Sequence, residues 1–556
     1  MRFIYAIFLM AIILTSLPQK EVFAAVDFSD VPDDSWAVSA IGYAVGAGLI
    51  SGLGDGNFGY GQPVTRAQFL ALISNMFNWG ESQAVSPTFA DVLPDAWYFR
   101  HVEAAANRGI IDANIFGYAG GIFNPNEHIL RQDMAVWLVR ALGYSSLATQ
   151  VEAFERLPFS DVSSYDGYII IAHDIGMIGG IGGGQFAPYN TATREQAAAM
   201  ITHVHRRLNA PLDWVHGFYA FASFHQRELI RDMNSVSFGW SRMEWSAEGG
   251  AWLNTSSEQG NDWVIPGGYE LIINFPGEVG AQTQLSVFMD TSMGLSEMIA
   301  CESSRNQAVS AIIDEATRVY VAVGRSPFDG VTINFEGLRG RASREYFTIF
   351  LTALEYRIRA AGLRLYVTVH PSTIDGIYFD GYDIRRIGEL ADSVILMAHD
   401  YHPRSLDGFL GTHWHRNAAI TPIAEVYRAL KAITDPATGV SDRSKIAIAF
   451  NFANIGWFID ENDRVVQPTP WTVPMDTALT RMAQPDTYFG WSNNFRNPYI
   501  IYTTETGEIV FLWHENYRSV YEKLTLARLF GITGASVWRI GMIPNAPEWD
   551  VWGNFR

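Results

Sequence analysis

A short motif recurs three times in the first third of the chain, and this repeat constrains the fold more than any other feature. The motif Phe-x-Asp-Val begins at Phe28, Phe89 and Phe159. In each copy a helical pattern, a Gly-rich loop and a second helical pattern follow. We expect the first helices at residues 37–47, 98–108 and 167–175. Repetition of one set of elements in one order indicates a single structural unit used three times.

The second helix of each copy begins with a similar signal. These helices are predicted to begin after Thr65, Leu130 and Thr193. Thr65 and Thr193 are predicted N-caps, and a Gln three residues later completes a capping box. The order of the pieces resembles the S-layer homology domain, with repeats at residues 26–83, 84–150 and 151–208. The resemblance implies a compact, all-α, three-fold module that binds a secondary cell-wall polysaccharide, often one with acidic pyruvylated sugars.

Charged residues stand at matching positions of the three repeats. They are Arg66, Arg131 and Arg194 at the start of the second helices, and Asp30, Asp91 and Asp161 in the opening motif. A guanidinium makes two-pronged contacts with carboxylates, so with the resemblance we assign these residues to the wall-polysaccharide site. The alternative is that each Arg covers its own helix or pairs with a motif Asp. Trp36 and Trp97 also match in position, and we interpret them as core residues rather than as a ligand platform.

The composition excludes several classes of protein. Among 556 residues there are 39 Lys and Arg against 58 Asp and Glu, a net charge of −19, which opposes binding to nucleic acid. The single cysteine, Cys301, excludes an intramolecular disulfide framework. Aromatic residues make up 13% of the chain, a fraction that fits a protein that handles carbohydrate.

The first residues have the layout of a secretory signal. Arg2 precedes an apolar run over residues 3–14, and small residues follow at Ala24 and Ala25. The run is shorter than the roughly 20 residues that a membrane span needs. We therefore expect a signal peptide at residues 1–24, no membrane span after its cleavage, and a secreted protein of the bacterial cell wall or S-layer.

The rest of the chain alternates apolar runs of strand length with helical patterns. Strands are expected at residues 214–221, 235–238, 285–289, 330–335, 364–369, 393–398, 445–450 and 535–538. Eight strands with crossovers predict a (β/α)8 TIM barrel over residues 212–556. Aromatic, alternating segments at residues 467–515 predict a small α+β insertion after the seventh strand. An open doubly wound sheet is the alternative, but no Gly-rich phosphate loop follows a strand.

The fourth expected strand has one polar face. In residues 329–336, Asp-Gly-Val-Thr-Ile-Asn-Phe-Glu, alternation places Thr332, Asn334 and Glu336 on the same side. The carboxyl ends of barrel strands form the active-site mouth, so Glu336 is expected there with Asn334 one step beneath it. A strand with a merely solvated face is the alternative.

These strand ends resemble glycoside hydrolase family 18, which includes chitinases and spore-cortex peptidoglycan hydrolases. The matching positions are residues 329–336, Met397-Ala398-His399-Asp400, and Trp538. The run Trp513-His514-Glu515-Asn516, with Ser519 and Lys523, resembles the bacterial, peptidoglycan-directed branch. The resemblance implies that Glu336 is the general acid and that the acetamido oxygen of the substrate attacks C1. It assigns catalysis to Glu336, Asn334 and Asp400, and substrate binding to Asp329, Thr332, Met397, His399, Tyr401 and Trp538.

Three positions depart from the family pattern, because Thr332 and Asn334 replace carboxylates and His399 replaces a Tyr. A neutral Asn334 does not supply the charge that stabilises an oxazolinium ring, so we expect reduced activity. Two functions stay open: a wall-anchored retaining hydrolase of β-1,4-linked N-acetylglucosamine polymers such as peptidoglycan or chitin, and a lectin-like surface protein that binds such glycans without cleaving them. No cofactor or metal is expected, and His413 and His415 are interpreted as solvated.

Overall fold

The computed structural model describes residues 28–80, 84, 86–112, 121–372, 379–544 and 550–556. The expected signal peptide, residues 1–24, lies outside these residues. The chain divides into two compact units, Met1–Arg206 and Arg207–Arg556, which are described separately. No described helix has the length and the apolar character needed to cross a membrane.

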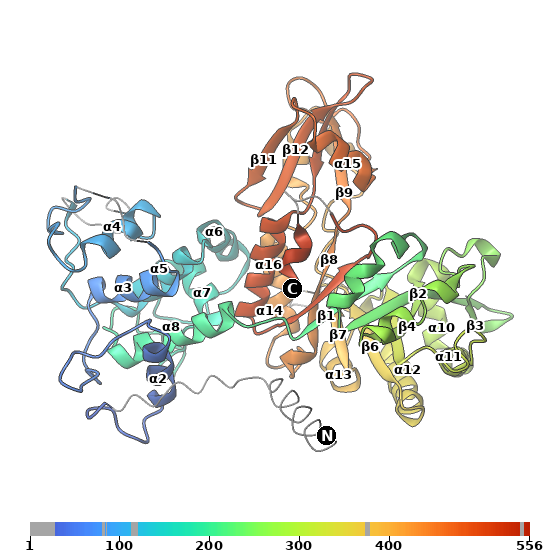
Figure 1. Cartoon of the computed structure of the whole chain (residues 1–556), viewed down its shortest axis with the longest axis horizontal. Helices are drawn as coiled ribbons and strands as arrows, with labels where there is room; N and C mark the ends of the chain where they lie inside the picture. Colours follow the sequence, from blue (N-terminus) through green and yellow to red (C-terminus); the bar gives the residue numbers. More distant parts are fainter. Residues whose placement is uncertain (1–27, 81–83, 85, 113–120, 373–378, 545–549) are drawn as a thin grey trace, which may run out of the picture. The chain divides into compact units, whose positions relative to one another are not determined.

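The first unit is built of helices (Figure 1). The first helices of the three repeats are α2 (Val38–Gly46), α4 (Phe99–Asn107) and α7 (Asp166–Asp174), and the second helices are α3 (Arg66–Met76), α5 (Arg131–Ala141) and α8 (Arg194–Leu208). An additional helix, α6 (Ser145–Phe154), lies between α5 and α7. The capping box at Thr65 forms in full, whereas the one at Thr193 is half formed, because the buried Thr193 hydroxyl has no hydrogen-bond partner.

The segments that lead into the three second helices hydrogen-bond to one another in a ring. The Val64 N–H donates to the Ala192 carbonyl at 2.9 Å, Ala192 donates to Ile129 at 3.3 Å, and Ile129 donates back to Val64 at 3.0 Å. Each of these residues stands two places before the Arg that begins a second helix. The three repeats therefore close around a shared centre.

The second unit contains a closed parallel barrel. Its strands are β1 (Trp214–Tyr219), β2 (Ser235–Ser246), β4 (Gln282–Asp290), β5 (Gly330–Glu336), β6 (Arg364–Val369), β7 (Ser393–Leu396), β8 (Ile446–Asn451) and β14 (Gly534–Trp538). They follow the order β1-β14-β8-β7-β6-β5-β4-β2, and pairing of β1 with β2 closes the ring. The predicted TIM barrel is confirmed, and the expected strands coincide with these eight.

Helices cover the outside of the barrel (Figure 1). They are α9 (Phe275–Glu278), α10 (Leu295–Ala300), α11 (Glu302–Thr317), α12 (Gly340–Ala360), α13 (Ile384–Leu390), α14 (Ile423–Ile433) and α16 (Tyr517–Leu529). The connecting segments also contain 3-10 turns: η2 (Phe221–Asp232), η3 (Glu258–Gly260), η4 (Tyr269–Leu271), η5 (Thr291–Met293), η6 (Asp407–Phe409), η7 (Trp414–Asn417), η8 (Arg443–Lys445) and η10 (Val551–Asn554). The outward face of β5 is apolar, and Phe335 stacks on Phe350 of α12 at 5.3 Å between ring centroids. This packing turns the polar face of β5 inward.

Two additions extend the barrel. Strand β2 continues beyond its expected end and pairs antiparallel with β3 (Gly250–Asn254), an arm that the sequence did not predict. Between β8 and β14 lies the expected insertion, a sheet in the order β10-β9-β13-β12-β11 with helix α15 (Met475–Met482). Its strands are β9 (Asn454–Ile459), β10 (Trp471–Val473), β11 (Tyr488–Ser492), β12 (Asn497–Thr503) and β13 (Ile509–Trp513). The insertion thus begins at Asn454 rather than at residue 467.

Candidate active site

Glu336 is the last residue of β5 and lies at the carboxyl end of the barrel. Its side chain is 31% exposed, whereas Asn334, one step beneath on the same face, is 2% exposed. The amide Nδ2 of Asn334 donates to Glu336 Oε1 at 3.0 Å. The hydroxyl of Thr368, on β6, donates to Asn334 Oδ1 at 2.6 Å, which fixes the orientation of the amide.

The surroundings of Glu336 favour its protonated form. Burial raises the pKa of the carboxyl, and the nearby charges of Asp290 and Asp400 raise it further. The hydrogen bond from Asn334 and the charge of His399 act in the opposite direction, but the pKa remains above its ordinary value. A carboxyl group with a raised pKa keeps its proton to a higher pH than an ordinary glutamate does, which suits general acid chemistry.

Thr332 lies deeper, in an uncharged network inside the barrel. Its hydroxyl and that of Ser237 are 2.6 Å apart, and Ser237 lies 2.7 Å from Nε2 of His216. The other ring nitrogen of His216 contacts the Ser536 hydroxyl at 2.8 Å. Burial lowers the pKa of His216 to about 3, so the ring is neutral at physiological pH. Thr332 is fully buried in this network, beneath Asn334.

Asp400 stands at the mouth, after β7, with a 44% exposed side chain. Its carboxylate accepts hydrogen bonds from Asn451 Nδ2 at 2.8 and 3.0 Å and contacts His399 Nδ1 at 2.9 Å. Burial alone would raise the pKa of Asp400, but the charge and hydrogen bond of His399, with the Asn451 bond, lower it to about 2. Asp400 is therefore a permanent anion at the mouth.

Aromatic rings line the mouth beside these groups. Trp538, at the end of β14, lies 5.1 Å from Phe218 and 5.8 Å from Trp263, and Trp263 stacks on Phe288 at 4.4 Å between centroids. Trp263 also covers Gly239, where a Cβ atom would lie 3.1 Å from the indole. The planes of Trp263 and Trp538 are inclined by 35°, and Trp538 packs on the buried Phe218. An indole at this place offers an apolar face of the kind that matches a pyranose ring.

The structure also places three further residues that were expected to bind substrate. Asp329 precedes β5 at the amino end of the barrel, where its carboxylate accepts the backbone N–H of Thr283 at 2.8 Å. The assignment of Asp329 to substrate binding is corrected by this position. The Tyr401 hydroxyl contacts the Glu425 carbonyl at 3.5 Å, and Met397 is half buried directly after β7.

The structure brings to the mouth four residues that the sequence analysis missed. They are Asp290, which ends β4, His370, which follows β6, Asn451, which ends β8, and Trp263, in the segment after β3. The first three are polar residues at the carboxyl ends of predicted strands, and that position was the available signal. Trp263 had no such signal, because the arm that precedes it was not predicted.

In the first unit, each repeat arginine contacts a neighbouring repeat. Arg131 donates to the carbonyls of Phe186 and Gly179 at 3.0 and 2.9 Å, and Arg194 donates to those of Phe58 and Ser51, both at 2.8 Å. The guanidinium groups of Arg66, Arg131 and Arg194 also lie 4.9 to 5.1 Å from the ring centroids of Phe123, Phe186 and Phe58. The arginines thus join the repeats in a cycle.

The motif aspartates hold the Gly-rich loops of their own repeats. Asp30 accepts three backbone N–H groups, from residues 58–60, at 2.7 to 2.8 Å. Asp91 and Asp161 each accept two, at 2.6 to 2.8 Å. Burial acts to raise the pKa of Asp30, but these hydrogen bonds lower it below its ordinary value. At Asp161 the same kind of hydrogen bond is the main cause of a lowered pKa. The carboxylates therefore have a structural role.

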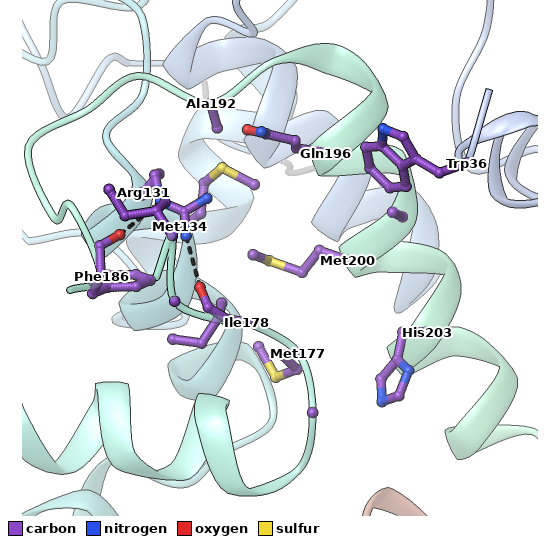
Figure 2. Close-up of a pocket in the computed structure, with 15 residues that line it drawn as sticks. Trp36, Arg131, Met134, Met177, Ile178, Phe186, Ala192, Gln196, Met200 and His203 are labelled. Atoms are coloured by element: carbon purple, nitrogen blue, oxygen red, sulfur yellow. Dashed lines mark hydrogen bonds between the residues drawn. The ribbon is translucent and has the colours of Figure 1, made fainter. Parts of the chain in front are cut away.

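A pocket of about 490 Å³ lies beside Arg131 (Figure 2). Its lining comes from all three repeats and includes Trp36, Met177, Met200 and His203. In Figure 2, Trp36 and Arg131 lie on opposite sides of this pocket. Trp36 is 65% exposed and Trp97 is 60% exposed, so the interpretation of both as core residues is wrong.

No group of three or more metal-ligating side chains occurs within the described ranges. His413 and His415 both contact Asp463, at 3.3 and 3.1 Å. His415 is fully buried, which corrects the expectation that both rings are solvated. Burial lowers the pKa of His415 to about 4, so its ring is neutral at physiological pH. Because Asp463 belongs to the insertion, these contacts attach the loop after β7 to the insertion.

Comparison with known families gives matches in both units. Residues 281–542 match the family model "Glycosyl hydrolases family 18". Residues 27–70, 88–135 and 158–198 match the model "S-layer homology domain". The two models cover separate parts of the chain.

Individual relatives match only parts of this chain. A putative sporulation-specific glycosylase, YdhD of Bacillus subtilis, is 26% identical over 251 residues, which are 45% of this chain and 55% of that protein. Exoglucanase XynX of Acetivibrio thermocellus is 31% identical over 195 residues, 34% of this chain and 17% of that protein. The chain thus spans about half, or less, of these relatives. Among solved structures, the spore cortex-lytic enzyme SleL of Bacillus cereus matches with a TM-score of 0.46 and 18% identity, over 62% of this chain and 73% of its own.

Proposed function

This chain carries three S-layer homology repeats and a glycosyl hydrolases family 18 domain, and from that premise we propose that it is a wall-anchored retaining glycosidase. The proposed substrates are β-1,4-linked polymers of N-acetylglucosamine. Peptidoglycan glycan strands are the nearest such polymer for a protein held on a cell wall. Chitin-like chains contain the same β-1,4 linkage.

One observation carries the proposal: a single carboxyl group with a raised pKa, Glu336, stands at the barrel mouth with an oriented amide beneath it. In the proposed reaction Glu336 gives its proton to the leaving oxygen as the bond from C1 to that oxygen breaks. The acetamido oxygen of the same sugar attacks C1 and forms an oxazolinium ring, so no enzyme nucleophile is needed. The Glu336 carboxylate then takes a proton from the water that opens the ring, which returns the acid to its starting state.

Asn334 and Asp400 have supporting roles in this proposal. Asn334 orients the acetamide and holds Glu336, but its neutral side chain adds no charge to stabilise the oxazolinium. Asp400, a permanent anion held by Asn451, is the nearby carboxylate that partly offsets this loss. Trp538 supports the flat face of the reacting sugar.

The S-layer homology repeats supply the proposed anchor. Because Arg131 and Arg194 are engaged with carbonyl groups of a neighbouring repeat, the pocket beside Arg131, with its exposed Trp36, is the better candidate for the wall polysaccharide. A secreted protein of the bacterial cell surface with these two parts would act on the wall that holds it.

The test is hydrolysis of peptidoglycan and of chitin oligomers, with new reducing ends identified by mass. Glu336→Gln should abolish turnover and keep sugar binding, because the amide preserves the shape and loses only the acidity. Asn334→Asp should raise the rate about tenfold, which corresponds to about 1.4 kcal/mol. Glu345→Gln, on the exposed face of α12, is the matched control and should leave the rate unchanged. Activity indifferent to Glu336→Gln contradicts the assignment of the acid, and a wild-type protein that only binds these glycans points to a lectin.

A further inference from the structure

His370 lies at the barrel mouth next to the proposed acid. It directly follows β6, and its Nε2 atom is 3.8 Å from Oε2 of Glu336. The imidazole stacks on Phe379 with 4.1 Å between ring centroids, and the ring of Tyr382 lies 6.2 Å away at a steep angle. These rings hold the imidazole with an edge toward Glu336, and its side chain is only 18% exposed.

The two oxygens of the Glu336 carboxyl have different neighbours. Oε1 accepts the N–H of Asn334, whose amide is in turn oriented by Thr368. An oxygen that accepts this N–H keeps its lone pair for the bond, so the carboxylic proton belongs on the other oxygen. That oxygen, Oε2, is the one that faces His370.

We propose that His370 is a positioning residue whose neutral imidazole accepts a hydrogen bond from protonated Oε2 of Glu336 and aims that proton at the leaving group. The inference rests on the proposed function, in which Glu336 must be protonated when substrate binds. The proposed hydrogen bond requires the distance between His370 Nε2 and Glu336 Oε2 to shorten from 3.8 Å to about 3 Å. On substrate binding the leaving oxygen takes the place of the imidazole as acceptor.

The electrostatic surroundings favour a neutral pair over an ion pair. Burial lowers the pKa of His370 to about 4, and burial raises the pKa of Glu336. The ionisable groups that face the pair come from the ends of β4 and β7 and from the start of α12: Asp290, His399, Asp400 and Arg339. His399 and Arg339 lower the pKa of His370, whereas the anion Asp400 raises it. The balance leaves the shared proton on the carboxyl.

His370 offers a hydrogen-bond acceptor to Glu336 on a strand whose other inward positions, Thr332 and Asn334, hold neutral residues in place of carboxylates. Asn334 acts on Glu336 as a donor and so favours its ionised form. A neutral imidazole on the second oxygen acts in the opposite direction, because it stabilises the protonated form. The hydrogen bond to His370 therefore favours the protonated form of Glu336, whereas the hydrogen bond from Asn334 alone would favour the ionised form.

The first test reads the protonation state without any need for turnover. The full chain is labelled with ¹⁵N-histidine, and the His370 signals are assigned by their absence in His370→Gln. Between pH 5 and 7 the wild type should show a neutral imidazole whose Nε2 carries no proton. An imidazolium in this range overturns the proposal, because the pair would then be a salt bridge with an ionised Glu336.

The second test is the pH profile of kcat/KM. His370→Ala removes the acceptor and admits water, so the alkaline limb, which reports the loss of the Glu336 proton, should move down by about one pH unit. His370→Gln keeps an acceptor oxygen and should restore most of this shift. His128→Leu, an exposed histidine of the first unit, should leave the profile unchanged. A lower rate with an unmoved limb in His370→Ala overturns the positioning role.

Failure of the proposed function is distinguishable from failure of this inference. If the wild type cleaves no glycan and the nitrogen signals still show a neutral imidazole whose Nε2 carries no proton, the hydrolase proposal falls and the hydrogen bond stands. If the wild type cleaves glycan and the imidazole is charged, the reverse holds.

Discussion

A fully buried ion pair joins the insertion to the barrel, and its removal provides a test of the fold. Lys523 of α16 donates to both oxygens of Glu515 at 2.7 and 2.9 Å, and to the Thr421 hydroxyl at 2.6 Å. Both charged side chains are 1% exposed. Asn497, the first residue of β12, donates to Glu515 at 3.1 Å. We expect Lys523→Met to lower the stability of the second unit, because it leaves an uncompensated carboxylate in the interior.

The size of the effect follows from this geometry. Breaking a buried pair by removal of one partner costs about 3–5 kcal/mol. Because Asn497 and Ser519 still donate to Glu515, the lower end, about 3 kcal/mol, is expected. The double variant Lys523→Met with Glu515→Gln removes the stranded charge as well. It should therefore be more stable than Lys523→Met alone by about 1 kcal/mol or more.

The assay is urea unfolding of the full chain, with intrinsic tryptophan fluorescence to follow the second unit. Arg341→Met is the control, because its pair with Glu345 on α12 is exposed and should leave the midpoint in place. If Lys523→Met unfolds at the wild-type midpoint, or if the double variant is less stable than the single one, the buried pair does not hold the insertion to the barrel.

Two further predictions concern the wall anchor and the barrel interior. Trp36→Ala should reduce the fraction of full-length protein that sediments with sacculi that retain their secondary polysaccharide. The control Val321→Ala, at an exposed position of the second unit, should not reduce it. Equal sedimentation of the wild type and Trp36→Ala would contradict the assignment of the polysaccharide to the pocket beside Arg131. Because the folded-state pKa of His216 is lowered to about 3, the unfolded chain binds a proton below about pH 6.5 that the folded chain rejects. The contribution of His216 to stability should therefore fall by about 1.4 kcal/mol for each pH unit below about pH 6.5, and His216→Asn, measured by denaturation at pH 7 and pH 5, should show a smaller decrease.

Much of the barrel could be predicted because its strands are buried on both sides. Apolar runs of four to eight residues between helical patterns located all eight strands, and alternation in β5 placed Asn334 and Glu336 on the inner face. The arm β2–β3 was missed because its residues, at the edge of the barrel, lack such a run. Strand register is a property of the closed ring, so the proximity of His370 to Glu336 could not be read from one strand alone.

The repeats show a different limit. The matching positions of Arg66, Arg131 and Arg194 were evident, but their partners lie in neighbouring repeats. The sequence offered a ligand, the helix of the arginine itself or a motif Asp as the partner. The structure shows hydrogen bonds to carbonyl groups of the next repeat, with the charges of Asp161 and Asp30 close to Arg131 and Arg194. Trp36 illustrates the converse, because a large apolar residue at a repeated position is usually buried, and only the fold reveals its exposure.

The cycle of contacts in the first unit fixes the number of its repeats. In a stacked array of repeats, each copy meets the next along an open axis, so copies are gained or lost at the ends with little penalty. Here the contact from the third repeat returns to the first, since Arg194 reaches Phe58 and the Val64 backbone reaches Ala192. A fourth repeat would find both neighbouring surfaces already occupied, and the loss of one repeat would expose two surfaces that now contact it. Recombination among the repeats is therefore tolerated only when it replaces one copy with another and preserves the total of three.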